Sequence, residues 1–405
     1  MRSKMVASMT AQASGKPMKL LVALGLSASA LIFSGCATTS STSTSSSPGS
    51  NGSAVDRALF HHVAAKDRVV FQYRAAATAM RRGQFEEAKR LLDDALLTAG
   101  SIVAGDKNAK KARGYFSEES KKTFKGEPYE RVMAYYYRGI LYWMDGELDN
   151  ARACFRSAQL QDSDSENQQY ASDYVLLDYL DGYATSKLRG DGSDAIKRAR
   201  AAAKLAIPPE YPSDANAIFF VEFGQGPVKY ATGQYNEQLR FRPGQSTARE
   251  VMIKAGTQAV HIGPYDDLSF QATTRGGRVM DHILENKAVF KSTTDTVGDA
   301  AIISGAVVTA ANRQNSEVGL GLVAAGLLSK IVSAATTPSA DTRMWDNLPQ
   351  FLSFGAMKLP PGQHTVTVEF LDSNRRPLPN LTKTLTINVA SPDRDTVVYV
   401  SDKSS

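Results

Sequence analysis

The chain has 405 residues, of which 42% are hydrophobic and 22% are charged. This composition is typical of a folded protein and excludes disorder throughout, and the length predicts two or three domains. The formal net charge is +6, but four bases precede the first apolar run, and without them it is +2. A basic footprint for nucleic acid is therefore absent, and the two distant cysteines, Cys36 and Cys154, exclude a disulfide framework and a Cys-only zinc site.

The N-terminal segment is predicted to be a lipoprotein signal peptide. Residues 20–33 carry no charge, but this run of fourteen is too short to cross a bilayer, which needs about 20 residues. The residues that close it, Phe33-Ser34-Gly35-Cys36, resemble the lipobox of bacterial lipoproteins, in which the cysteine is diacylated and becomes the mature N-terminus. We expect residues 1–35, or 18–35 if Met18 is the start, to be removed and Cys36 to carry the lipid. The alternative is a cleaved secretory signal in which Cys36 is incidental.

Residues 36–54 are predicted to form a tether. Most of them are Ser, Thr, Gly, Asn and Pro, a composition that cannot bury enough apolar surface to fold. By resemblance to Gram-negative lipoproteins, Ala37 after the cysteine favours the outer membrane. We therefore expect a lipid-anchored protein of the bacterial cell envelope, held at the outer membrane with its folded part in the periplasm.

Residues 55–210 are predicted to be helical, because apolar residues recur at three- and four-residue spacing. One stretch matches the tetratricopeptide (TPR) pattern in residue type and spacing, through Tyr135, Gly139, Tyr142, Gly146, Leu148, Ala151, Phe155 and Ala158. A second copy lies upstream, through Ala76, Ala79, Gly83, Phe85, Ala88, Leu92 and Ala95, and a degenerate third runs through Tyr179, Gly182, Gly190, Ala195, Ala199 and Ala202. We expect a short TPR-like solenoid whose concave face binds protein partners. The alternative is a packing scaffold for the C-terminal half.

Two aromatic residues of the first match are candidate partner-binding residues. Tyr136 and Trp143 are seven positions apart and hence share one helical face, and such residues dominate interface energetics when exposed. The alternative is that both pack against the neighbouring hairpin. Cys154 is predicted to be a buried small hydrophobic residue rather than a reactive thiol.

From about residue 211 the spacing of apolar residues changes from the helical pattern to one that includes β-strands. Residues 211–350 are therefore predicted to form a mixed β/α domain. Residues 217–223 are a β-rich run, and Gly224-Gln225-Gly226-Pro227 after it is a strand-ending turn rather than a phosphate loop. A second strand is expected within 235–242. Residues 297–335 contain two apolar, Ala- and Gly-rich runs that are too short to span a bilayer. We expect them to form a buried helical hairpin, the alternative being insertion into the membrane.

Residues 351–405 are predicted to be a C-terminal antiparallel β-module. Residues 364–370, 381–389 and 396–400 alternate between apolar and polar types, as strands with one buried face do. The predicted fold class is therefore α+β, with an N-terminal TPR-like helical solenoid followed by a mixed, mainly antiparallel β domain that contains the Ala/Gly-rich helical hairpin.

The best candidate for a functional loop precedes this module, at Asp341, Arg343, Trp345 and Asp346, where charge and aromatic character cluster. The alternative is a self-contained turn in which Arg343 pairs with a neighbouring acid and Trp345 fills the core. None of the five histidines has a metal-binding spacing, and no nucleophile motif occurs. We therefore expect no catalytic residues, no metal and no cofactor.

The C-terminal half carries a second resemblance. Val221-Glu-Phe-Gly-Gln-Gly-Pro-Val-Lys229, Ala340-Asp-Thr-Arg-Met-Trp-Asp-Asn-Leu-Pro349, Pro361-Gly-Gln-His-Thr-Val366 and Val397-Val-Tyr-Val400 follow a TPR-like hairpin. This arrangement is similar to an uncharacterised family of bacterial TPR-containing outer-membrane lipoproteins. The resemblance implies protein partners, among them other envelope lipoproteins of the secretion or envelope-assembly kind.

The predicted function is that of a lipid-anchored envelope adaptor or scaffold that binds protein partners through its repeats. One alternative is a structural subunit without a binding groove that forms homo-oligomers through residues 297–335. A second alternative is an envelope hydrolase or a regulator of one, in which Asp341, Arg343 and Asp346 would be needed for turnover.

Overall fold

A computed structural model describes residues 63–105, 123–163, 173–274 and 339–403. The predicted signal peptide, Cys36, the tether and the hairpin within 297–335 lie outside the described residues. Within the described ranges the protein is mixed α+β, with sheets that are rich in antiparallel pairs. No helix in these ranges is both long and apolar enough to span a bilayer.

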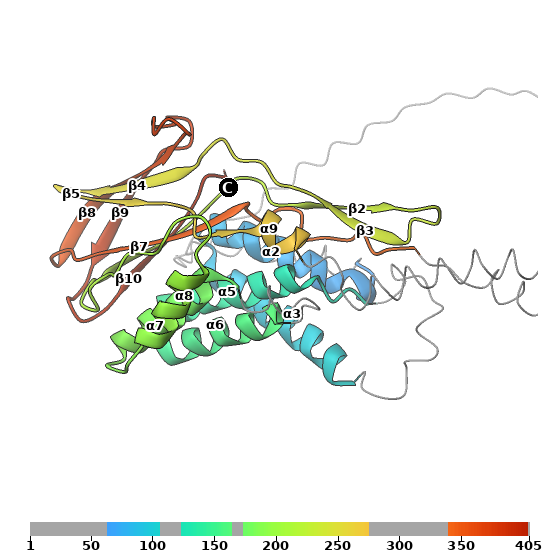
Figure 1. Ribbon diagram of the computed structural model, residues 1–405. Helices are drawn as coiled ribbons and strands as arrows, with labels where there is room; N and C mark the ends of the chain where they lie inside the picture. Colours follow the sequence, from blue (N-terminus) through green and yellow to red (C-terminus); the bar gives the residue numbers. More distant parts are fainter. Residues whose placement is uncertain (1–62, 106–122, 164–172, 275–338, 404–405) are drawn as a thin grey trace, which may run out of the picture. The chain divides into compact units, whose positions relative to one another are not determined.

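In the described ranges, six helices form three consecutive pairs that precede the strands (Figure 1). The pairs are α2 (Arg68–Arg81) with α3 (Phe85–Gly105), α5 (Pro128–Asp145) with α6 (Leu148–Asp162), and α7 (Val175–Lys187) with α8 (Ser193–Ala202). Two short helices stand outside the pairs. The 3-10 helix η1 (Ala65–Asp67) precedes α2, and α9 (Leu268–Thr273) follows the strand β6 (Asp266–Asp267). Gly83 and Gly146 make the first two turns with φ of +69° and +84°, which a side chain would disfavour. All six paired helices lie within residues 55–210, where the periodicity predicts helices.

Small residues let the paired helices approach closely. A Cβ built on Gly139 in α5 would lie 2.6 Å from the Phe155 ring of α6, and one built on Gly182 in α7 would lie 2.7 Å from the Ile196 side chain of α8. Ala151 and Phe155 are both fully buried. The glycine and alanine positions of the repeat pattern therefore lie at helix contacts, as expected from their residue types.

The strands form two four-stranded sheets and a separate hairpin. The first sheet has the order β10 (Thr396–Ser401), β1 (Ala217–Phe223), β7 (Phe351–Met357) and β6 (Asp266–Asp267). The second sheet has the order β5 (Gln258–Ile262), β4 (Glu250–Ala255), β8 (Gly362–Leu371) and β9 (Lys383–Val389), and β2 (Val228–Thr232) pairs with β3 (Gln238–Arg242). β1 and β10 run parallel, in the register Ala217 with Thr396, and the other named pairs are antiparallel.

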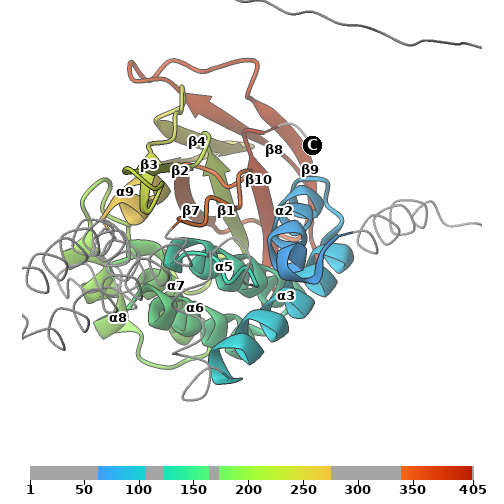
Figure 2. The ribbon, with the colours of Figure 1, turned by 90° about the vertical axis from the view of Figure 1, so that its right-hand side faces the viewer.

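The first sheet lies between the helices and the second sheet (Figures 1 and 2). All seven residues of β1 are buried, because alternate side chains face different layers. Phe220 belongs to the core shared with the helices, whereas Phe219 and Phe223 belong to the core shared with the second sheet. The first sheet is thus buried on both faces, with one core cluster against the helices and a second against the other four-stranded sheet.

Two predictions about the C-terminal strands need correction. The boundary expected at residue 350 does not separate two modules, because β7 and β10 join the first sheet with β1, while β8 and β9 join the second sheet with β4. The strand at 396–400 exists as β10, but it is parallel to its neighbour rather than antiparallel. The strands expected at 217–223, within 235–242, at 364–370 and at 381–389 are confirmed as β1, β3, β8 and β9.

Candidate functional site

The predicted functional loop is integrated into the fold. Trp345 is 1% exposed and stacks on Tyr73 of α2, with 4.5 Å between the ring centroids. Arg343 forms ion pairs of 2.6 Å with both Asp341 and Asp67, and Asp346 pairs with an arginine of α2 at 3.0 Å. As in the alternative prediction, Arg343 pairs with the neighbouring Asp341 and Trp345 fills the core, but the turn is not self-contained, because η1 and α2 supply further partners.

A buried ion pair lies next to this loop. The carboxylate of Glu130 in α5 accepts hydrogen bonds from Lys229 Nζ of β2 at 2.5 Å and from the backbone N–H of Trp345 at 2.6 Å. Burial raises the pKa of Glu130 although Lys229 opposes the shift, and burial lowers the pKa of Lys229. The pair joins α5, β2 and the loop.

Tyr136 and Trp143 are not available as partner anchors, which corrects the prediction made for them. Tyr136 is 2% exposed and Trp143 is fully buried. Both rings pack against Phe220 of β1, with centroid distances of 6.2 and 5.8 Å. The indole N–H of Trp143 also donates to Asp395 at 2.7 Å. The shared helical face therefore exists, but the first sheet covers it.

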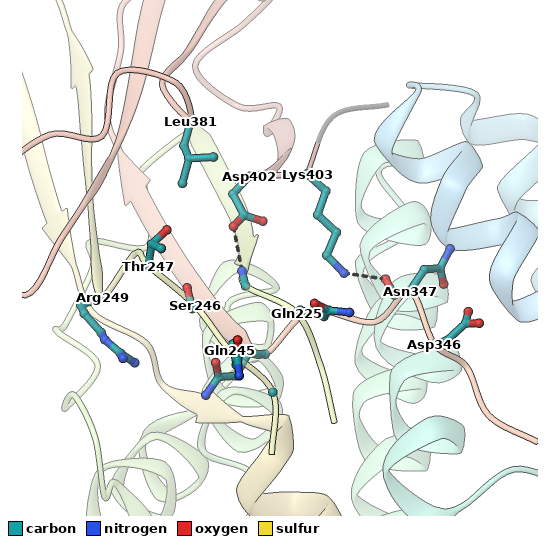
Figure 3. A pocket seen from close by; sticks show the side chains of 13 residues that line it. Gln225, Gln245, Ser246, Thr247, Arg249, Asp346, Asn347, Leu381, Asp402 and Lys403 are labelled. Carbon is teal, nitrogen blue, oxygen red and sulfur yellow. Dashed lines mark hydrogen bonds between the residues drawn. The ribbon is translucent and has the colours of Figure 1, made fainter. Parts of the chain in front are cut away.

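A polar groove of about 900 Å³ opens where the parallel strands β1 and β10 end (Figure 3). Five chain segments converge on it: the turn after β1, the β3–β4 connection, the loop before β7, the approach to β9 and the residues after β10. Its lining consists of Gly224, Gln225, Gly244, Gln245, Ser246, Thr247, Arg249, Asp346, Asn347, Gln350, Leu381, Asp402 and Lys403. The volume is within the range of about 300–1,000 Å³ that is typical of ligand sites.

The turn after β1 shapes the groove. Gln225 and Gln245 exchange backbone hydrogen bonds of 2.8 and 3.0 Å, so the turn lies directly against the β3–β4 connection. Gly224 has a φ of +77°, and a Cβ there would lie 2.6 Å from the Cβ of Ser246. The turn predicted from the sequence is thus confirmed, and its glycine allows the close contact.

Charged groups of both signs line the groove. Lys403 Nζ donates to the carbonyl oxygens of Asn347 and Leu348 at 3.0 and 2.8 Å, and burial together with nearby Arg81 lowers its pKa to about 8. Asp402 accepts a 2.8 Å hydrogen bond from the N–H of Gly224, and burial raises its pKa. Arg249 is exposed.

A buried network supports the groove from the side of the helices. Glu222, the sixth residue of β1, forms a 2.8 Å ion pair with Arg81 at the end of α2 and accepts a 2.5 Å hydrogen bond from the Tyr137 hydroxyl. Arg81 also donates to the carbonyl oxygen of Asn347 at 2.7 Å. The network therefore holds the loop that carries Asn347 in place.

The other cysteine and histidine side chains that the structure describes lie apart from one another and from the groove. Cys154 is buried, as predicted, and burial raises the pKa of its thiol to about 11. His261 pairs with Glu250 at 2.8 Å on the second sheet. Within the described ranges, no group of His, Cys, Asp and Glu side chains could hold a metal ion.

Of the candidate functional residues predicted from the sequence, only Asp346 lines the groove, and the turn at Gly224 and Gln225 was predicted only as the end of a strand. The other lining residues come from segments up to 179 positions apart, from Gly224 to Lys403, and no local motif connects them. Comparison of the chain with protein-family models, curated proteins and solved structures finds no match. The similarity to bacterial TPR lipoproteins therefore stays a prediction from the sequence.

Proposed function

We propose that this protein is a lipid-anchored adaptor of the bacterial cell envelope that holds a protein partner near the outer membrane. The observation that carries the proposal is an open polar groove on the folded part, downstream of a lipobox and a Ser/Thr-rich tether. Anchoring confines the search for a partner to the membrane surface and raises the effective concentration of the site.

The three helix pairs fit TPR-type units, and this assignment is part of the proposal. The close contact of Gly139 with Phe155, the buried Ala151 and the left-handed turn at Gly146 support it. Their inner aromatic residues pack on the first sheet, so the helices act in this proposal as the support of the groove rather than as the binding surface.

The lipid anchor is tested by metabolic labelling with radioactive palmitate in a bacterial host. The wild-type chain should incorporate label and fractionate with the outer membrane, whereas Cys36→Ala should incorporate none. Cys154→Ala is the matched control, because it removes the other cysteine of the chain and should leave labelling unchanged. Equal labelling of Cys36→Ala and wild type would contradict the anchor.

The adaptor role is tested by cross-linking in the native envelope, followed by purification of the full-length chain and mass spectrometry. A partner protein recovered in fixed ratio supports the proposal. Recovery of only the chain itself, as a stable oligomer, would replace it with the structural-subunit alternative. If the wild-type chain shows a hydrolase activity that Asp341→Asn abolishes without unfolding the protein, the hydrolase alternative would be favoured.

A further inference from the structure

Three acceptor oxygens of the groove residues are buried without a hydrogen-bond donor among the described residues. They are Oδ1 of Asn347, Oε1 of Gln350 and Oδ1 of Asp402. Gln350 is only 7% exposed, and the amide nitrogen of Asn347 is already committed to Arg74 and Thr78 of α2. Since a buried acceptor without a donor costs about 1–3 kcal/mol, these atoms favour a ligand that supplies N–H or O–H groups.

The groove also holds two cations that no carboxylate within 4.0 Å neutralises in the described ranges. Arg249 and Lys403 take part in no ion pair there, whereas Asp346 is paired with Arg74. Figure 3 shows Arg249 on the strand connection and Lys403 across the groove from it, near Asn347. The guanidinium of Arg249 lies 6.0 Å from the centroid of the Phe351 ring and is exposed. A planar guanidinium without a carboxylate partner is suited to bidentate contact with a carboxylate.

The chemistry of the lining narrows the class of ligand. Leu381 is its one large apolar side chain, so an acyl chain would gain little from burial here. The lining contains no aromatic ring on which a nucleobase could stack. A peptide supplies both parts that the groove lacks, since its backbone N–H groups are donors and an acidic side chain or C-terminus is a carboxylate.

We propose that the groove binds a peptide segment of the partner, whose carboxylate pairs with Arg249 and whose backbone N–H groups donate to Gln350 and Asp402. This inference rests on the proposed adaptor function and names the chemistry of its partner. Lys403 lies across the groove and adds a second positive charge for an acidic segment.

The test uses the full-length chain in detergent micelles and three pools of short, random, fluorescein-labelled peptides. The pools differ at one fixed position, which is Glu, Gln or Lys, and binding is measured by fluorescence polarisation. The Glu pool should bind about tenfold more tightly than the Gln pool. Arg249→Ala should abolish this preference, whereas Gln350→Met, which removes the amide acceptor, should weaken both pools equally.

The matched control is Arg394→Ala. Arg394 is also exposed, but it precedes β10 and is thus at the opposite end of that strand from the groove. This variant should keep the Glu preference of the wild type, and circular dichroism should confirm that all three variants are folded. The proposal is overturned if the Lys pool binds more tightly than the Glu pool, or if Arg394→Ala loses the Glu preference as fully as Arg249→Ala does. It is also overturned if no pool binds at about 1 mM, or if soluble peptidoglycan sugar fragments bind in place of the peptides.

A cross-linking arm separates this proposal from the adaptor function itself. Arg249→Ala should lose the partner that the wild-type chain captures in the envelope, and Arg394→Ala should retain it. If Arg249→Ala captures that partner equally well, the groove assignment fails while the adaptor function stands. If the wild-type chain captures no partner, the adaptor function fails irrespective of the peptide measurement.

Discussion

Arg81 and Glu222 form a buried ion pair between the end of α2 and β1, and removing Arg81 should destabilise the fold strongly. Their side chains are 5% and 1% exposed, and the shortest N–O distance is 2.8 Å. Arg81→Ala leaves the carboxylate of Glu222 buried without its cation and releases the carbonyl oxygen of Asn347. Breaking a buried pair from one side costs about 3–5 kcal/mol, a large part of the roughly 5–15 kcal/mol that holds a typical domain folded.

The pH dependence of this loss gives the sharper test. Burial by itself would raise the pKa of Glu222, but Arg81 and the hydroxyl of Tyr137 hold it below its ordinary value. A lowered folded-state pKa stabilises the protein above the unfolded value of about 4.3 and loses this effect as the pH falls below it. In Arg81→Ala burial is no longer offset by the guanidinium, so the pKa of Glu222 should rise above its ordinary value. The variant should therefore regain stability as the pH falls from 7 to 5, and its deficit against the wild type should shrink.

Urea unfolding at several pH values measures both quantities, with fluorescence of Trp143 and Trp345 as the signal, since both are buried. Arg394→Ala is the control for loss of an arginine and should stay within about 0.5 kcal/mol of the wild type. The double variant Arg81→Met with Glu222→Leu should cost less than Arg81→Ala alone, because it leaves no buried charge. A deficit below about 1 kcal/mol for Arg81→Ala, or one that is constant between pH 7 and 5, would refute the reasoning.

Three further predictions concern the core. Trp143→Ala should lower the free energy of unfolding by about 3–5 kcal/mol. Trp143→Phe should lower it less, because this variant chiefly loses the hydrogen bond to Asp395. Equal effects of the two variants in urea unfolding would contradict this prediction. Gly139→Ala should destabilise by about 1–3 kcal/mol despite the better helix propensity of Ala, because the new Cβ would lie 2.6 Å from the Phe155 ring; a higher melting temperature would contradict the contact. Asp266 accepts two backbone N–H bonds at the start of α7, and burial raises its pKa to about 7. Its contribution to stability should therefore fall as the pH rises from about 4 to 7. Asp266→Asn should remove this contribution to the dependence of the melting temperature on pH, and an unchanged dependence in the variant would contradict the prediction.

The helices and most strands could be predicted because their signals are local. Alternation of apolar side chains identifies a strand such as β8 from a few residues, and the spacing of Gly139, Ala151 and Phe155 identifies a close helix pair. The same local signals do not predict which strands pair with each other in a sheet. The parallel partner of β1 is β10, which follows it by more than 170 residues, and no pattern within either strand specifies that pairing.

The burial of Tyr136 and Trp143 shows the same limit. Periodicity places both residues on one helical face, but the face is equally apolar whether a partner or the chain's own sheet covers it. In the structure Phe220 of β1 covers it. Likewise, the charged loop at residues 341–346 resembles a site in sequence because its partners, Asp67 and Arg74, are far away in the chain.

Local sequence suffices to identify the helix pairs, the strand periods and the strand-ending turn at Gly224, since each depends on residues that are neighbours in the chain, and the leader and tether stay predictions of the same kind. Contacts between distant segments place the first sheet between two core clusters and pair β10 with β1 in parallel, and they bring Gln225, Arg249, Gln350 and Lys403 to one groove. The physical reason is that burial and hydrogen-bond pairing depend on contacts between residues that are far apart in the sequence. A side chain acquires its surroundings only when the segments that form them have packed together.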